Sequence, residues 1–208
     1  MSDAEHDPVL TTLAELDVPA PAGMAQRIFT GWLAAPSVLG EVYVAVSDRG
    51  VQFLRSAAFV NDDPETFAEL YRDRFDRPLR PLQHPPTGLP AALRGRRAAP
   101  ALDLAMLSPF HRAVLTATRE IPAGETRSYS WVAREAGRPN AVRAAASALA
   151  RNPVPLLVPC HRVTRTGGGV GQYLFGPATK RRLLREEGVD PTPNARLAAR
   201  TADEPDPE

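Results

Sequence analysis

The pattern of hydrophobic and polar positions predicts a series of short helices in the second half of the chain. The first has Phe110 and Val114 on one face and ends in a turn that contains proline and glycine at residues 121–124. Ser128 can cap the second helix, which ends at Gly137. The pattern therefore indicates two short helices in succession.

A third helix is expected from Ala141 to Arg151, after a three-residue turn. One side of it is aliphatic and consists of Val142, Ala145, Ala146 and Leu149. The other side carries a cation in the first turn and mostly small side chains after it: Arg143, Ala144, Ser147, Ala148 and Arg151. Two short helices joined by a tight turn predict a helix-turn-helix that inserts Arg143 into a surface. An alanine-rich helix chosen for its propensity, with a solvated Arg143, fits the same pattern.

The first half of the chain predicts a small sheet with one helix. Residues 41–46 and 51–54 are apolar segments separated by a turn, which indicates a hairpin. A helix is expected over residues 63–75, where an aspartate and a proline stand at its start. Residues 78–100 are rich in proline and too irregular for a packed element, so we expect a linker and a domain boundary there.

These patterns predict an α+β protein with a small N-terminal domain of sheet and helix and a mainly helical C-terminal domain. We place an N-terminal extension at 1–27, which includes a short helix at 7–16. The small domain and its proline-rich linker then cover 28–105, and the helical domain covers 106–190. A disordered tail is expected at 191–208, because it has almost no large apolar side chains.

Composition narrows the class of protein. The 208 residues are 43% hydrophobic and 24% charged, and no apolar run has the length needed to cross a bilayer. The acidic start of the chain does not suit a signal peptide, so we expect a soluble, cytoplasmic protein. Cys160 is the only cysteine, which excludes an intrachain disulfide and a zinc site made of several cysteines.

The net charge of +1 hides an uneven distribution along the chain. Residues 108–190 have 13 Lys and Arg against 6 Asp and Glu, whereas the remainder has 12 against 18. Among these cations only Lys180 is a lysine, and the planar arginine fork suits phosphates and bases. The basic half is a candidate polyanion binder, although an arginine bias that reflects codon composition on a solvated surface fits equally well.

Cys160 is the candidate nucleophile. It follows an apolar run at 156–158, which we expect to be buried extended chain, and it precedes His161 and Arg162. A lone cysteine is more often a small core residue, and a nucleophilic one needs a base or positive charge nearby. His161 can reach the sulfur through a water or a turn, because adjacent side chains of extended chain point to opposite faces.

Glu187 is the candidate partner of that histidine. It lies on the same face of the last helix as Leu183 and Leu184, which predicts that it points inward. A buried carboxylate that orients a histidine is what activation of a thiol requires. The alternative is that Glu187 turns to solvent or pairs with Lys180 or Arg185.

These motifs together resemble the O6-alkylguanine-DNA alkyltransferases, also called methylated-DNA–protein-cysteine methyltransferases. The similarity runs from about Ser108 to Gly188, and the proline-cysteine-histidine-arginine sequence after an asparagine-proline pair is its most specific part. The matching residues are Ile121-Pro122-Ala123-Gly124-Glu125-Thr126, Ser128-Tyr129, Gly137-Arg138-Pro139, Arg143-Ala144, Asn152-Pro153, Val158-Pro159-Cys160-His161-Arg162-Val163, Gly171, Tyr173, Lys180, Leu183-Leu184 and Glu187-Gly188.

The resemblance implies DNA repair by a direct, irreversible transfer of an alkyl group from guanine O6 to a cysteine, once per molecule and without a cofactor or metal. In that family the corresponding residues would act as follows: Cys160 accepts the alkyl group, His161 is the base acting through water, Glu187 orients the histidine, and Asn152 braces the turn below the cysteine. We expect double-stranded DNA as partner and a monomer that associates with the nucleoid.

The resemblance also implies how the DNA is held. The helix-turn-helix would enter the minor groove, with Arg143 filling the place of the rotated-out nucleotide and Tyr129 near the rotated phosphate and the guanine, which its hydroxyl would contact. Ala144, Ser147 and Arg151 would complete the DNA-binding face. The alkylguanine pocket would include the carbonyl groups of Val158 and Cys160, together with the neighbouring residues Pro159, Tyr173, Leu174 and Phe175.

Two departures from the family pattern affect the expected pocket and core. Many members follow the pocket tyrosine with a serine and two glycines, where this chain has Leu174, Phe175 and Gly176. We therefore predict a bulkier rim that accepts methyl but resists benzyl groups. Leu115 stands where a tryptophan is usual, which we interpret as repacking of the core. The first hundred residues match only loosely.

Other functions remain open from the sequence. A related protein that binds alkylated guanine without repairing it would lack the cysteine that this chain has. A regulator in which Cys160 senses alkylating agents could coexist with repair. A cysteine hydrolase would use Cys160 and His161 for many turnovers and would need neither Arg143 nor a basic pair of helices.

Overall fold

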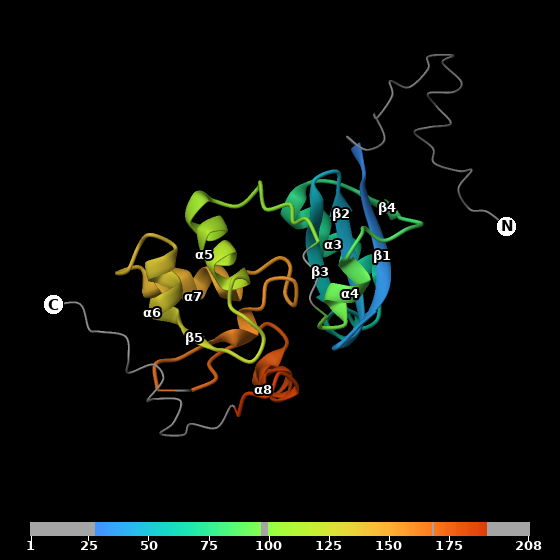
Figure 1. Cartoon of the computed structure of the whole chain (residues 1–208). Helices are drawn as coiled ribbons and strands as arrows, with labels where there is room; N and C mark the ends of the chain where they lie inside the picture. The colour runs from blue at the N-terminus through green and yellow to red at the C-terminus, as the bar shows by residue number, and fades with distance from the viewer. Residues whose placement is uncertain (1–27, 97–99, 168, 191–208) are drawn as a thin grey trace, which may run out of the picture.

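The computed structural model describes residues 28–96, 100–167 and 169–190, and it places two units side by side (Figure 1). The first unit contains a four-stranded sheet, and the second contains most of the helices. The helix predicted at 7–16, the extension at 1–27 and the tail at 191–208 lie outside the described residues. In the described part of the chain, no helix is both long and apolar enough to cross a membrane.

The sheet has the strand order β3-β2-β1-β4. Strands β1 (Thr30–Ser37), β2 (Gly40–Ser47) and β3 (Gly50–Ser56) pair antiparallel, and β4 (Leu79–Pro81) runs parallel to β1. The predicted hairpin is confirmed as β2 and β3. Strands β1 and β4 were not predicted.

Helix α3 (Pro64–Phe75) covers one face of this sheet. Its N-cap is Asp63, whose carboxylate accepts hydrogen bonds from the backbone N–H groups of Glu65 and Thr66 at 3.1 and 3.0 Å. The predicted helix is thus confirmed with its cap. Between helix and sheet lies a cluster of aromatic rings, made of Tyr43, Phe53, Phe67, Tyr71 and Phe75. Because side chains alternate along a strand, the other face of β2 and β3 is free to pack against the second unit.

The expectation that residues 78–100 form no packed element is wrong. They contain β4 and the short helix α4 (Leu89–Leu93), in which Leu89 and Leu93 are fully buried. A proline in the first turn of a helix removes no hydrogen bond, so Pro90 is compatible with α4.

The chain beyond this segment is also attached to the hairpin. The N–H of Val51 donates to Ala101 O at 2.9 Å, and the N–H of Asp103 donates to Val51 O at 2.9 Å. Gly50 has φ +136°, and a Cβ there would lie 2.4 Å from Ala101 O, so this close approach requires glycine. The domain boundary at 105/106 stays a prediction.

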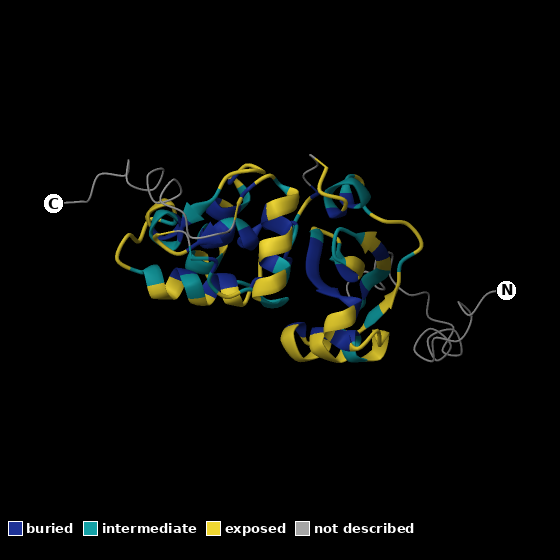
Figure 2. Cartoon of the chain, turned by 90° about the horizontal axis from the view of Figure 1, so that it is seen from below, coloured by how far each residue is buried: buried dark blue, intermediate teal, exposed yellow. Residues whose placement is uncertain are grey.

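The second unit has the helices that the sequence predicted. They are α5 (Pro109–Arg119), α6 (Tyr129–Glu135), α7 (Val142–Ala150) and α8 (Gly176–Glu186), with a two-stranded parallel pairing of β5 (Arg127–Ser128) and β6 (Val163–Thr164). Ser128 caps α6 by accepting a hydrogen bond from Trp131 N at 3.1 Å. Helices α5, α6 and α7 pack against one another. Figure 2 shows that the outer faces of the helices are exposed.

The buried face of α7 differs in detail from the prediction. Ala145 and Leu149 are buried as expected, whereas Val142 and Ala146 are only partly buried. Ala148, which was predicted on the outward side, is buried. Ala148 lies three residues after Ala145, and this spacing brings both to one face of a helix. The inward stripe of α7 is therefore rotated slightly from the predicted one.

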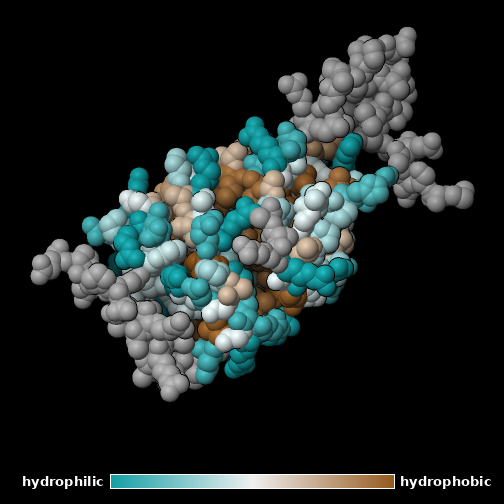
Figure 3. Space-filling view, viewed as in Figure 1, coloured by the Kyte–Doolittle hydropathy of each residue, from teal (hydrophilic) through white to brown (hydrophobic). Residues whose placement is uncertain are grey.

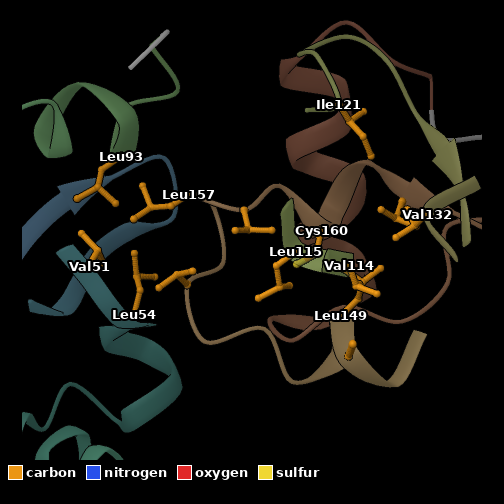
Figure 4. Packing of buried hydrophobic residues seen from close by; sticks show 14 of the residues in the cluster. Val51, Leu54, Leu93, Val114, Leu115, Ile121, Val132, Leu149, Leu157 and Cys160 are labelled. Carbon is orange, nitrogen blue, oxygen red and sulfur yellow. The ribbon is translucent and has the colours of Figure 1, made fainter. Parts of the chain in front are cut away.

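One hydrophobic core joins the two units. Figure 4 shows Leu157, from the loop before Cys160, beside Val51, Leu54 and Leu93 of the first unit. The same cluster continues to fully buried residues of the second unit, among them Leu115. Figure 3 shows hydrophilic residues over much of one face of the molecule, with smaller hydrophobic areas between them. The loop that carries the candidate nucleophile is thus held between the sheet and the helices.

Candidate active site

Cys160 lies in a short 3-10 turn, η2 (Cys160–Arg162), and is 6% exposed. The side-chain amide of Asn152 donates to Cys160 Sγ at 3.2 Å and to Val158 O at 3.1 Å. Asn152 Oδ1 accepts from Val154 N at 3.0 Å. Asn152 is buried and every one of these contacts lies within the loop, so its amide holds the turn and points a donor at the sulfur.

The apolar run before the cysteine is a turn and not the extended chain that was expected. Leu156 has a φ of 72°, in the left-handed region, and Val158 N donates to Val154 O at 3.0 Å. Hydrophobicity predicted the burial of this segment correctly, since Leu157 and Val158 are buried. It could not predict the reversal of the chain, which the contacts of Asn152 stabilise.

His161 and Glu187 meet as predicted. His161 Nε2 and Glu187 Oε1 are 3.0 Å apart, and both side chains are mostly buried. Arg162 is a second partner of the same carboxylate, through Nε to Oε2 at 2.9 Å and a terminal nitrogen to Oε1 at 2.8 Å. Another Arg162 nitrogen donates to Ile121 O at 2.6 Å. Glu187 therefore does not pair with Lys180 or Arg185, and Arg162 is a site residue that the sequence reasoning did not assign.

The charge states follow from these contacts. Burial opposes ionisation of Glu187, but hydrogen bonds from His161 and Arg162 outweigh it and lower the pKa of the carboxyl to about 2. Burial lowers the pKa of His161, although Glu187 opposes this shift. At neutral pH the pair is thus a carboxylate beside a neutral imidazole. With Nε2 donating to the carboxylate, the lone pair of the imidazole is on Nδ1.

His161 Nδ1 is buried and has no hydrogen-bond partner among the described residues. The hydrogen bonds of the described residues include none between the imidazole and Cys160 Sγ, whose amide partner is Asn152. The ring of Tyr173 meets that of His161 edge-on, with 6.2 Å between centroids. The acceptor nitrogen of the imidazole is therefore buried and unpaired within the described residues, and the role of His161 as a base acting through water stays a prediction.

Burial raises the pKa of the Cys160 thiol, and the Asn152 hydrogen bond and the charges of Lys180 and Arg55 counteract it. Lys180 is fully buried, and its Nζ donates to Val163 O at 2.5 Å. Burial lowers the pKa of Lys180 to about 8. Sequence reasoning treated Lys180 as part of the family pattern and as a possible partner of Glu187, and did not place its ammonium near the sulfur.

A groove of about 510 Å³ leads to Cys160. Helix α7 forms one side of it with Arg143 and Ser147, both exposed, and the loop at 171–174 forms the other. Gly171 has φ +69°, and a Cβ there would lie 3.1 Å from the Tyr129 hydroxyl, so the loop approaches this ring closely. The lining consists of Tyr129, Val142, Arg143, Ala146, Ser147, Leu149, Ala150, Cys160, Arg165, Gly171, Gln172, Tyr173 and Leu174.

Some of the predicted DNA-binding and pocket residues line the groove, and the others do not. Tyr129, Arg143, Ser147, Tyr173 and Leu174 line the groove, as do Arg165 and Gln172, which the sequence reasoning did not assign. The remaining predicted residues lie elsewhere: Ala144 and Arg151 are exposed on the surface, Val158 and Pro159 are buried, and Phe175 packs against Phe59 and Tyr173 with centroids 6.1 and 5.6 Å apart.

Comparison with known proteins places the chain in a family. Residues 109–189 match the family model described as 6-O-methylguanine DNA methyltransferase, DNA binding domain. A methylated-DNA–protein-cysteine methyltransferase of Mus musculus is 34% identical over 180 residues, which cover 80% of this chain and 85% of the mouse protein. This chain belongs to the methylated-DNA–protein-cysteine methyltransferase family. The predicted resemblance is confirmed.

Two further comparisons describe this methyltransferase family member. A protein of the same name from Methanothermobacter thermautotrophicus is 48% identical over 88 residues, 42% of this chain, so the match spans about half, 49%, of that relative. The crystal structure of Mycobacterium tuberculosis OGT in complex with DNA is similar with a TM-score of 0.59 and 28% identity, over 78% of this chain and 95% of that one. This likeness confirms the predicted α+β fold class.

Proposed function

We propose that this methyltransferase family member repairs DNA by moving the alkyl group of O6-alkylguanine irreversibly onto Cys160. The observation that carries the proposal is the placement of Cys160 at the buried end of a groove, with an amide donor on its sulfur and a carboxylate–imidazole pair beside it. In the step, the S–C bond forms as the O6–C bond breaks. The guanine keeps the electron pair on O6 and takes up one proton, and the thiol proton goes to His161.

The surrounding groups support the formation of a thiolate. A free thiol has a pKa of about 8.5 and needs a base or positive charge to react at neutral pH. Here the neutral His161 is the base through its Nδ1, and Glu187 with Arg162 holds the ring in place. Lys180 and the Asn152 amide stabilise the negative sulfur. Lys180, Arg55 and the imidazole act together against the desolvation of the thiolate.

The groove side of α7 suits duplex DNA as the substrate. A base whose O6 must reach a buried sulfur has to leave the stack, at a cost of about a few kcal/mol. Arg143 is exposed in the first turn of α7, where it can occupy the vacated place, and the small side chains Ala144 and Ser147 let the helix approach the groove of the DNA. The α6–α7 pair is the proposed helix-turn-helix. We also propose a cytoplasmic monomer that associates with the nucleoid.

The mass of the intact protein tests this function. After incubation with duplex that contains O6-methylguanine, the protein is expected to gain one methyl group, and Cys160→Ala is expected to gain none. Repeated turnover would indicate a hydrolase instead. If the protein binds the lesion but its mass does not change, it is a binder that does not repair. Either of these two results would overturn the proposal.

A further inference from the structure

Three hydrogen bonds from the sheet unit hold the backbone that carries Asn152. Arg74 of α3 donates to Arg151 O at 3.0 Å, so it holds the carbonyl directly before Asn152. On the following side, Leu54 N of β3 donates to Pro153 O at 2.8 Å, and Arg55 donates to the same oxygen at 3.2 Å. The peptide unit before Asn152 and the peptide unit after Pro153 are therefore fixed from outside the helical unit.

The position of Asn152 decides whether the sulfur has a donor. Its amide spans from Val154 N to Cys160 Sγ, with all three hydrogen bonds between 3.0 and 3.2 Å. Hydrogen bonds weaken steeply when distance or angle departs from these values. A small shift of the Asn152 backbone would thus remove a donor from Cys160 without breaking the fold of the loop.

Arg55 is unusual for a buried arginine. It is 7% exposed, its guanidinium stacks on Phe53 at 4.0 Å from the ring centroid, and its hydrogen bonds go to two carbonyl oxygens, those of Leu54 and Pro153. Buried charges are normally paired with an opposite charge, because desolvation is costly. Burial and the charge of Arg74 lower the pKa of Arg55 to about 9, whereas negative charge on Cys160 favours the charged guanidinium.

We propose that Arg55 and Arg74 are positioning residues of the transfer reaction, which hold the peptide units before Asn152 and after Pro153 so that the Asn152 amide stays directed at the Cys160 sulfur. The sheet unit is then part of the active-site machinery. This inference rests on the proposed function and extends it to residues outside the family-like segment 108–188.

Other charged and titratable groups also face the sulfur, and a test has to separate Arg55 from them. Lys180 of α8, Tyr129 and Tyr173 interact electrostatically with Cys160, and His161 of η2 is the next residue in the chain. These four groups belong to the helical unit. Substitutions at Arg55 and Arg74 leave them in place.

Arg182 provides a matched control. It is an exposed arginine of α8 that also joins the two units, by donating to Val38 O at 3.2 Å. Its hydrogen bond to Val38 and its ion pair with Glu186 involve no residue of the segment 151–160. Arg182→Met therefore loosens an arginine–carbonyl contact between the units without touching the backbone around Asn152.

The experiment compares Arg55→Met, Arg74→Met and Arg182→Met. Methyl transfer from O6-methylguanine duplex is measured in a single turnover, and the apparent thiol pKa is measured from the pH dependence of the reaction with iodoacetamide. We expect transfer to slow about tenfold in the first two variants, since each loses a hydrogen bond from a charged group. The thiol pKa is expected to rise in Arg55→Met, and Arg55→Lys to restore part of both. Arg182→Met is expected to behave as the wild type.

Wild-type rates and an unchanged thiol pKa in both Arg55→Met and Arg74→Met would overturn the inference. An equal loss in Arg182→Met would also overturn it, because the effect would then be one of general contact between the units. Thermal unfolding checks the fold of each variant, and if Arg55→Met does not fold, the exposed Arg74→Met decides. If the wild type accepts no methyl group, the proposed function fails, while the iodoacetamide reaction still tests the positioning role.

Discussion

The charge pattern of the site depends on single residues, and Glu187 contacts two of them. One carboxylate accepts from both His161 and Arg162, and this fixes the tautomer of the imidazole and the direction of its free nitrogen. Orientation of a base by a third group is a general feature of activated nucleophiles. The same contacts make Glu187 a source of pH-dependent stability.

We expect Glu187→Gln to flatten the acid limb of the stability profile. The pKa of Glu187 is lowered from 4.5 to about 2 in the folded protein, so its contribution is present above about 4.5 and is lost as the pH falls toward 2. Urea unfolding at a series of pH values measures this. The exposed neighbour Glu186 is the control, and Glu186→Gln should keep the wild-type slope. Parallel curves for Glu187→Gln and the wild type would refute the assignment.

The rim of the groove leads to a prediction about the size of the alkyl group. Leu174 lines the groove, whereas Phe175 packs against Phe59. Leu174→Gly is expected to raise the rate with O6-benzylguanine relative to O6-methylguanine, because it removes a branched side chain from the path of the larger group. Phe175→Leu should leave this ratio unchanged. Single-turnover rates with both substrates decide, and a wild type that reacts equally fast with the two would contradict the restriction.

Among the elements, the short helix α4 shows how a proline-rich segment can still pack. Leu93 is fully buried in the core that joins the two units. Leu93→Ala is expected to lower the free energy of unfolding by about 2–5 kcal/mol, the usual range for such a cavity. Arg94→Ala, at an exposed position one residue further, should change it by less than about 0.5 kcal/mol. Equal effects of the two substitutions in urea unfolding would mean that α4 is not packed.

The elements that were predicted and those that were missed differ in a physical way. Helices α5 to α8 have local signals, since the apolar period of each lies within one short stretch of chain, and α5 and α6 also begin at a capping serine. Strand β1 contains Gly31 and Pro36 and has no clear alternation, so its identity depends on pairing with β2. Strand β4 has only three residues and pairs with β1 across more than forty positions of sequence. Pairing between such distant segments cannot be predicted from the hydrophobic pattern of either segment alone.

The site residues differ in the same way: some have a local sequence signal, and others are placed only by tertiary contacts. Cys160, His161, Asn152 and Glu187 were assigned because their types and spacing match a known family. Arg55 comes from the other unit and reaches the loop through tertiary contacts, so nothing in its own surroundings in the sequence indicates a role near the sulfur. The bend at Leu156 was missed for a related reason, because a leucine with a positive φ is stabilised by contacts of other residues.

For the whole molecule, the uneven charge predicts a strong effect of salt. The excess of cations in residues 108–190 is expected to bind the phosphates of any sequence. Each phosphate neutralised adds about 0.9 to the slope of log affinity against log salt concentration, so binding of lesion-free duplex should weaken steeply as salt is raised. Fluorescence anisotropy over a salt series measures the slope. Affinity that hardly changes would show that this surface does not bind the DNA backbone.

The sheltered position of the sulfur also determines how long an unused molecule lasts. Cys160 is buried, and burial favours its thiol form, which peroxides and stray electrophiles attack slowly. Under the proposed function the protein reacts once, so it could not recover from a reaction with the wrong electrophile, since the transfer leaves no free thiol. Enclosure of Cys160 would then keep unreacted protein available for an alkylated base.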